Sequence, residues 1–261
     1  MSAPTTSELF DRGRRALVRD RAATLEPELL LLRRAFDECL DRLRDIDRPF
    51  ERALLVGSPT PDWPRQLATL CGTVDVFDPG PRFAATANGL TGAEDRHDFG
   101  EKRYDLVVAV GTLDTVNDLP VALQLLRRAM RPDAPFIGAL AGGDSLPALR
   151  SAMIDADRAT GAVAARTHPR IEPSSFAGLL AAAGFVMPVV DVDRVKLRYP
   201  SLAALVRDLR LMGASNVLVD RSPARGRKWA SLAATAFAAN ACEGRIDERI
   251  DILHFVGWSP A

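Results

Sequence analysis

The sequence has few of the residues that build metal centres, disulfide frameworks or aromatic surfaces. Its 261 residues include three cysteines and three histidines, and aromatic residues make up only 6%. The cysteines have neither disulfide nor zinc spacing, and the histidines fall in no metal-binding motif. We therefore expect no metal site, and a reducing compartment such as the cytoplasm is favoured over a secreted location.

The chain also lacks an excess of charge of either sign and lacks a long apolar run. Lys and Arg together number 34, as do Asp and Glu, so the formal net charge is zero. Balanced charge argues against a general affinity for nucleic acid or anionic membranes. No apolar segment reaches the ~20 residues that cross a bilayer, and the acidic residues among residues 1–21 argue against a targeting peptide. We expect a cytoplasmic protein without membrane insertion.

Aliphatic residues are abundant, and their pattern predicts an α/β fold. Hydrophobic residues make up 47% of the chain, enough for a sizeable core. Short apolar runs alternate with helical patterns, which predicts a mostly parallel, Rossmann-like central sheet with helices on both faces. Predicted strands lie at 52–57, 73–78, 105–110, 135–140, 185–195 and 245–258, of which the last could insert antiparallel. Residues 7–48 have a helical pattern, further helices are predicted at 62–70, 118–130, 145–160, 174–183, 201–212 and 229–241, and residues 82–103 are polar and weakly patterned.

The carboxyl ends of the first three predicted strands form the candidate ligand site, because ligands of open α/β sheets bind at this edge. These ends are Gly57-Ser58, Asp78 and Val110-Gly111. A glycine after the first strand lets the backbone approach a ligand, and an acid after the second strand takes ribose hydroxyls. Asp78 follows Gly57 at the spacing of about 20 residues expected for such an acid. In the alternative interpretation, Asp78 only caps the turn at Pro79-Gly80.

Four strings resemble those of the class I S-adenosyl-L-methionine (SAM)-dependent methyltransferases. They are Leu54-Leu55-Val56-Gly57, Val76-Phe77-Asp78, Tyr104-Asp105-Leu106-Val107-Val108 and Leu126-Arg127-Arg128-Ala129-Met130-Arg131-Pro132-Asp133. The resemblance implies a class I methyltransferase fold, transferase activity and SAM as the cofactor. The implied cofactor-binding residues are Gly57, Ser58, Asp78, Glu94, Asp95, Val110 and Gly111.

Further strings, spread over nearly the whole chain, resemble the complex I assembly factor 5 family. They include Leu9-Phe10-Asp11-Arg12, Val116-Asn117-Asp118-Leu119-Pro120, Gly142-Gly143-Asp144-Ser145-Leu146, Asp208-Leu209-Arg210-Leu211-Met212-Gly213 and Gly257-Trp258-Ser259-Pro260. This resemblance implies a role in respiratory complex I assembly, with a complex I subunit as protein substrate or partner. The mitochondrial member is described as an arginine hydroxylase. We expect a helical arm over residues 1–48 and a methyltransferase-like domain over residues 49–261, with a helical insertion at about 200–242.

The sequence departs from both families at the expected cofactor site. Pro59 and Pro61 stand where a glycine-rich turn is expected, and each proline fixes φ and removes an N–H donor. Asp114-Thr115 precedes Val116 where the assembly-factor family tends to carry an aromatic residue. Glu94-Asp95 could serve the adenine end, although its neighbours match poorly.

Three functions are compatible with these observations. They are a SAM-dependent methyltransferase, a catalytically inactive assembly factor with the same fold, and a nicotinamide-dependent reductase that would also use Gly57 and Asp78. No catalytic residue can be named, because no nucleophile or general base has a recognisable context. The basic run at residues 221–228 could dock an acidic partner or be a solvated loop. The arginines of the N-terminal helix could serve a lid over the cofactor.

Overall fold

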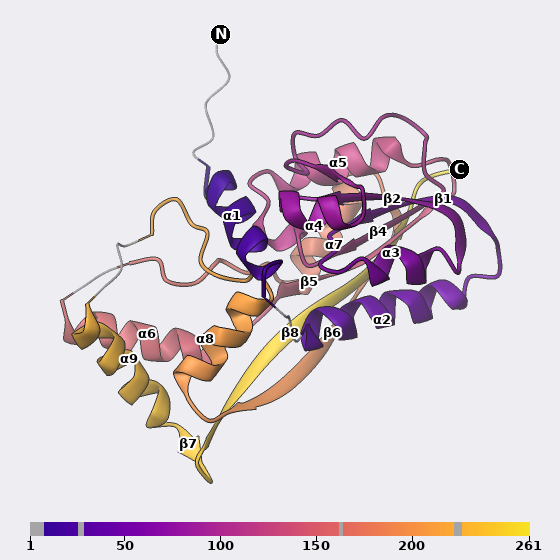
Figure 1. Cartoon of the computed structure of the whole chain (residues 1–261). Coiled ribbons are helices and arrows are strands. Elements are labelled where there is room, and N and C mark those ends of the chain that lie inside the picture. The colour runs from indigo at the N-terminus through magenta and orange to yellow at the C-terminus, as the bar shows by residue number, and fades with distance from the viewer. Residues whose placement is uncertain (1–7, 26–28, 162–163, 222–225) are drawn as a thin grey trace.

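The structure is a computed structural model that describes residues 8–25, 29–161, 164–221 and 226–261. Within these residues the chain forms an eight-stranded sheet of order β3-β2-β1-β4-β5-β8-β6, and β7 pairs with β8 (Figure 1). The strands are β1 (Phe50–Val56), β2 (Cys71–Asp78), β3 (Leu90–Thr91), β4 (Leu106–Val110), β5 (Pro135–Gly142), β6 (Val186–Tyr199), β7 (Ala241–Cys242) and β8 (Arg245–Trp258).

The first five strands are parallel, whereas β8 runs antiparallel to both β5 and β6. Every residue of β4 is buried, as expected for a strand covered on both faces. The carboxyl ends of β1, β2 and β4 therefore lie at one edge of the sheet. The predicted antiparallel insertion of the last strand is confirmed.

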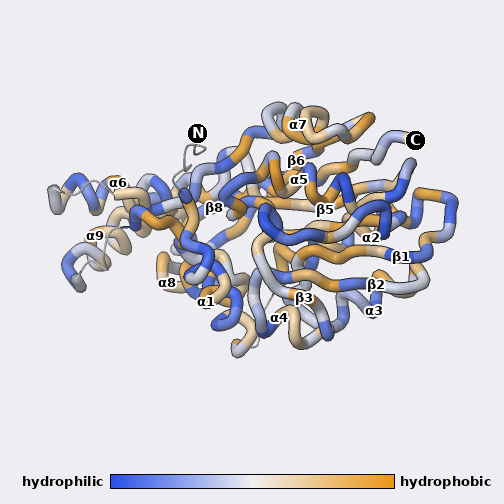
Figure 2. Tube along the Cα trace, turned by 90° about the horizontal axis from the view of Figure 1, so that it is seen from above, coloured by the Kyte–Doolittle hydropathy of each residue, from blue (hydrophilic) through white to orange (hydrophobic). Residues whose placement is uncertain are grey.

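Helices cover both faces of the sheet and enclose two apolar clusters (Figure 2). The helices are α1 (Arg12–Ala22), α2 (Leu30–Arg44), α3 (Asp62–Leu67), α4 (Pro81–Thr86), α5 (Leu119–Ala129), α6 (Pro147–Ala159), α7 (Pro173–Ala182), α8 (Leu202–Leu211) and α9 (Arg227–Ala238), with a 3-10 turn, η1 (Leu113–Thr115). One cluster joins α2 and α3 to the sheet, and Phe36 stacks on Trp63 within it. The other joins α5 and α7 to the opposite face, where Phe176 packs edge-on against Phe255.

The antiparallel pair of β6 and β8 extends beyond the other strands (Figure 1). Its register runs from Val189 opposite Val256 to Tyr199 opposite Ile246. The helices α6, α8 and α9 lie beside this extension, and their buried residues Leu149, Leu205 and Phe237 belong to the same apolar cluster as α2. This second group of helices stands next to the carboxyl edge of the parallel strands.

The predicted mixed sheet with flanking helices is confirmed. The region at residues 82–103, for which no element was predicted, contains the end of α4 and the two-residue strand β3. Both are too short to show a periodic pattern. No helix among the described residues is long and apolar enough to cross a membrane.

Candidate functional site

The helix α1 lies over the carboxyl ends of β2 and β4 and presents a row of arginines to them. Asp11 caps the helix, because its side chain accepts from the backbone N–H of Arg14. Arg12, Arg15 and Arg19 are spaced so that they share one helix face. Each of the three reaches a carboxylate at the edge of the sheet.

The N-terminal end of α1 is fastened to the loop after β4. The amide of Asn117 accepts from the N–H of Phe10 at 2.7 Å and donates to the carbonyl of Phe10 at 2.9 Å. Asp11 N–H also donates to the carbonyl of Val217 at 2.8 Å. The Asn117 contact explains what the string Val116-Asn117-Asp118 does in this chain: it holds α1 against the sheet edge.

Arg19 forms a bidentate pair with Asp78, the acid at the end of β2. Its Nε donates to Oδ1 at 2.7 Å and its Nη2 donates to Oδ2 at 2.6 Å. The side chains are 7% and 0% exposed, so the pair is shielded from water. Burial lowers the pKa of Arg19, but the charge and hydrogen bonds of Asp78 outweigh it, and the net shift is upward.

The same carboxylate receives two backbone donors. Ser58 N–H donates to Oδ2 at 2.9 Å and Gly80 N–H donates to Oδ1 at 2.7 Å. A carboxylate has about four acceptor sites, and all four are taken here. The interpretation of Asp78 as a turn-capping residue is thereby confirmed by the Gly80 contact, and no acceptor is left for a ribose hydroxyl.

Arg15 and Glu94 form the second buried pair. Nη1 and Nη2 of Arg15 donate to the two carboxylate oxygens at 2.6 and 2.9 Å. Nη2 also donates to the carbonyl of Thr112 at 2.6 Å, and Nε donates to the hydroxyl of Thr115 at 3.0 Å. The guanidinium is therefore tied both to Glu94 and to the loop after β4, and Arg15 lines the cavity beside that loop.

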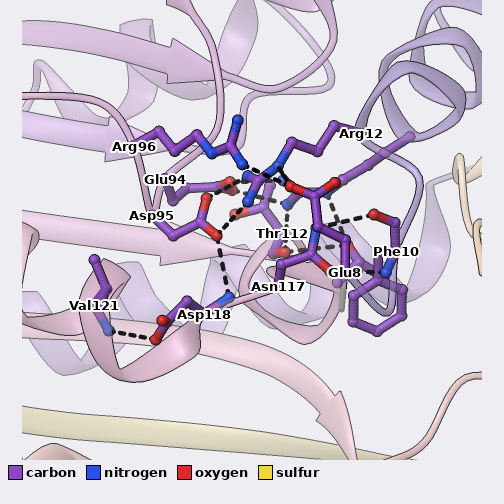
Figure 3. Close-up of polar contacts among 12 residues, drawn as sticks. Glu8, Phe10, Arg12, Glu94, Asp95, Arg96, Thr112, Asn117, Asp118 and Val121 are labelled. Atoms are coloured by element: carbon purple, nitrogen blue, oxygen red, sulfur yellow. Dashed lines mark hydrogen bonds and ion pairs between the residues drawn. The ribbon is translucent and has the colours of Figure 1, made fainter. Parts of the chain in front are cut away.

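Arg12 and Asp95 form the third pair, closer to solvent (Figure 3). Nη2 of Arg12 donates to Oδ2 at 2.8 Å, and Asp118 N–H donates to the same oxygen at 3.1 Å. Burial raises the pKa of Asp95, but the hydrogen bonds and charge of Arg12 outweigh it, so the pKa lies below its usual value. Figure 3 shows Glu94 beside this pair and Asn117 next to Phe10.

The glycines at the candidate site serve the packing of the protein itself. Gly57 has φ +87°, and a Cβ there would lie 2.3 Å from the carbonyl oxygen of Val110. Its N–H donates to the carbonyl of Phe77 at 2.8 Å. Gly111 has φ +67°, and a Cβ there would lie 2.6 Å from the side chain of Leu32 on α2. The backbone at Gly57 therefore packs directly on β4, whereas Val110 and Gly111 line a cavity of about 100 Å³ at the ends of β4 and β5.

The residues present do not fit SAM in this arrangement. Both backbone N–H donors of the turn after β1 already have acceptors within the protein. Gly57 donates to the carbonyl of Phe77, and Ser58 donates to the carboxylate of Asp78. Pro59 and Pro61 then offer no N–H at all. The carboxylates that would take ribose and adenine are bound to arginines. The structure does bring the candidate residues to one sheet edge, but α1 occupies that edge.

The sequence suggested a lid role for the arginines of α1 but did not predict that they pair with the acids at the strand ends. Their spacing along one helix face was a usable signal, since residues three and four apart are neighbours on a helix. The basic run at residues 221–228 falls partly outside the described residues, because positions 222–225 are not described. Among the described residues, no group of three or more His, Cys, Asp or Glu side chains could hold a metal ion.

Known proteins resemble this chain in sequence and in fold, although no family model matches it. The zebrafish (Danio rerio) protein named arginine-hydroxylase NDUFAF5, mitochondrial, is 29% identical over 266 residues, which cover 97% of this chain and 83% of that protein. The N-methyltransferase NodS from Bradyrhizobium japonicum superposes with a TM-score of 0.53, covering 95% of this chain and all of its own. The chain is similar to NDUFAF5 over nearly its whole length and has the fold of the class I methyltransferases. At 13% identity the likeness to NodS concerns the fold alone.

The resemblance to the complex I assembly factor 5 family is thus confirmed over nearly the whole chain. Mouse (Mus musculus) NDUFAF5 is 34% identical over 163 residues, which cover 61% of this chain and 48% of that protein. The chain spans about half the length of the mammalian NDUFAF5 relatives it matches.

Proposed function

We propose that this chain is a methyltransferase-fold assembly factor for respiratory complex I that acts by binding a protein partner and not by transferring a methyl group from SAM. The complex I role rests on the similarity to NDUFAF5. The absence of methyl transfer rests on one observation: Arg19 and Arg15 hold Asp78 and Glu94, the carboxylates that would bind the adenosyl group.

The energetic argument follows from the burial of these pairs. Separating a buried ion pair and leaving one partner uncompensated costs about 3–5 kcal/mol. Displacing two such pairs would offset most of the ~8 kcal/mol with which a micromolar ligand binds. SAM would therefore have to move α1 as a whole before it could contact the sheet edge.

Calorimetric titration of the full chain with SAM tests the proposal. We expect no measurable heat and no change in melting temperature with SAM, and the same with NADH. A SAM dissociation constant in the micromolar range would overturn the non-catalytic assignment.

A genetic experiment tests the complex I role separately. Deleting the gene in an organism that carries it should reduce assembled complex I on native gels, and the wild-type gene should restore it. Unchanged complex I in the deletion strain would remove this part of the proposal, whatever the titration shows.

A SAM-dependent methyltransferase is the second candidate, favoured by the position of Asp78. This residue ends β2 beside the turn at Gly57, where open α/β sheets place the acid that binds ribose. In this candidate α1 is a lid that leaves when SAM arrives. This candidate predicts that calorimetric titration with SAM gives measurable heat, whereas the first proposal predicts none.

A further inference from the structure

A groove lies beside α1, on the side away from the three ion pairs. It is bounded by α1, α6, α8 and the loop that carries His168, and its volume is about 620 Å³. Its apolar lining includes Val18, Leu146, Leu149, Met153, Val206 and Leu209. Leu146, His168 and Leu209 also line a smaller, mainly apolar cavity of about 100 Å³ at the ends of β4 and β5. The groove and the cavity are therefore adjoining compartments of one site.

The charge of the groove has a single sign. No carboxylate among the described residues lines the groove. Five arginines do: Arg14, Arg21, Arg166, Arg170 and Arg210. This is a local departure in a chain whose formal net charge is zero. An electropositive concave surface attracts anionic partners.

Some of these arginines have acidic partners outside the groove, and others do not. Arg166 pairs with Asp157 and Arg170 pairs with Asp114. Arg21 and Arg210 are exposed and form no ion pair with any described residue. The Nε of Arg14 donates to a backbone carbonyl, and its pKa is lowered by burial and by the neighbouring arginine charges. A bound anion would relieve this repulsion.

Leu146 stands at the boundary between the groove and the cavity in a strained conformation. Its φ is +60° and its ψ is +47°, the left-handed region that a leucine rarely adopts. Its N–H donates to the carbonyl of Arg249 at 2.7 Å, which helps to hold it there. Strain of this kind clusters at ligand clamps and functional sites. The conformation keeps the leucine side chain between the two compartments.

We propose that the groove binds an acidic, amphipathic segment of a protein partner. One apolar side chain of that segment enters the small cavity, and its carboxylates meet Arg14, Arg21 and Arg210. The inference rests on the proposed function, since it supplies the surface by which an assembly factor would hold its partner.

Two features favour a peptide over a small anionic lipid. The arginines come from α1, from α8 and from the loop at residues 164–170, so they suit several separate carboxylates better than one headgroup. The cavity of about 100 Å³ suits a branched aliphatic side chain better than a long acyl chain.

Fluorescence anisotropy with labelled probe peptides tests the inference. The probes are a short peptide of alternating glutamate and leucine, its counterpart with lysine in place of glutamate, and a fluorescent fatty acid. We expect the full chain to bind the acidic peptide, more weakly as salt is raised, and not the basic one. The variant Arg210→Glu should weaken binding about tenfold or more, because it reverses a charge at the rim.

Arg207→Glu is the matched control, because Arg207 lies exposed on the same helix but does not line the groove. It should change the affinity less than about threefold, as expected for a charge outside the contact. Equal effects of the two variants, equal binding of both peptides, or no binding of the acidic peptide would overturn the inference. Binding of the fatty acid alone, lost in Arg210→Glu, would replace the peptide with a small amphiphile. None of these outcomes depends on SAM, so they are distinguishable from failure of the proposed function.

Discussion

Arg19 and Asp78 join the first helix of the chain to the end of its second strand through two parallel hydrogen bonds of 2.7 and 2.6 Å. The residues are 59 positions apart in sequence. Bidentate pairs between arginine and a carboxylate are among the stronger polar contacts in proteins. This pair makes the candidate cofactor acid a structural residue of the chain.

Replacing Arg19 is expected to destabilise the whole protein. The variant Arg19→Ala leaves Asp78 buried without its counter-ion, and we expect a loss of about 3–5 kcal/mol in the free energy of unfolding. Urea denaturation followed by circular dichroism measures this difference. The free energy of unfolding of Arg19→Lys should lie between those of the wild type and Arg19→Ala, because an ammonium group keeps the charge but cannot form the bidentate contact.

Arg65→Ala is the control for this series. Arg65 pairs with Asp62 on the exposed surface of α3, so its removal should cost less than about 0.5 kcal/mol. If Arg19→Ala were no more destabilising than Arg65→Ala, the pair at Asp78 would not hold α1 in solution.

Gly57 is expected to be needed for folding because of its packing against β4. In Gly57→Ala, the new Cβ would collide with the Val110 carbonyl and the residue would keep a positive φ. We expect a loss of about 2 kcal/mol or more, as for other strained or overpacked positions. Gly178→Ala is the control, since a Cβ there meets nothing within 4 Å and alanine favours the interior of α7. It should stabilise by up to ~1 kcal/mol, and similar losses in both variants would contradict the packing argument.

Asp95 should report directly on its contact with Arg12. In Arg12→Ala the burial of the carboxyl remains while the hydrogen bonds and charge of Arg12 are removed, so its pKa should rise from its lowered value; the N–H of Asp118 still opposes the effect of burial. In the wild type, the lowered pKa adds stability above the unfolded-state value, and this is lost as pH falls through the folded value. Carboxyl ¹³C NMR titration measures the change. Arg96→Ala is the control, because Arg96 pairs with Glu8 instead; an equal shift there would disprove a specific Arg12 contact.

The stability of the chain should fall between pH 6.5 and about 4, in part because of His168. Burial lowers the pKa of His168 from 6.5 to about 4, with Asp114 and Arg170 as its charged neighbours. Its Nε2 accepts from Val217 N–H at 2.9 Å, which requires the neutral ring. Between these pH values the unfolded chain binds more protons than the folded chain, so lowering the pH destabilises the fold.

The variant His168→Gln tests this assignment. Urea denaturation at pH 7 and pH 5 should show a smaller pH-dependent loss than in the wild type, in which this residue contributes up to ~2 kcal/mol over that interval. Some loss should remain, since burial also lowers the pKa of His97 and His254. An unchanged difference between the two pH values would show that His168 does not titrate as proposed.

The sheet could be predicted from sequence because buried strands leave a local signal. The apolar runs at β1, β4 and β5 are continuous, and the acid after β2 follows at a characteristic interval. The shorter α4 and β3 could not be predicted, because two to six residues are too few for a period to emerge.

For the candidate site, the sequence predicted the acids but not the side chains that bind them. The sequence identified Asp78, Glu94 and Asp95 as neighbours at one edge, but the pairing of these acids with α1 is a long-range contact. Charge along a helix reveals which face is basic and does not reveal what that face meets. The prolines after β1 were the one local sign that the turn had lost its donors.

An acid retained at the end of β2 is ordinarily taken as a mark of nucleotide binding. Here Asp78 would be kept by natural selection even if no nucleotide ever bound, because losing it would strand a buried guanidinium inside the protein. The fold alone explains the presence of this carboxylate at the end of β2, so the carboxylate does not by itself indicate a nucleotide site. The arginines of α1 that face the strand ends therefore have to be considered together with this acid when its role is interpreted.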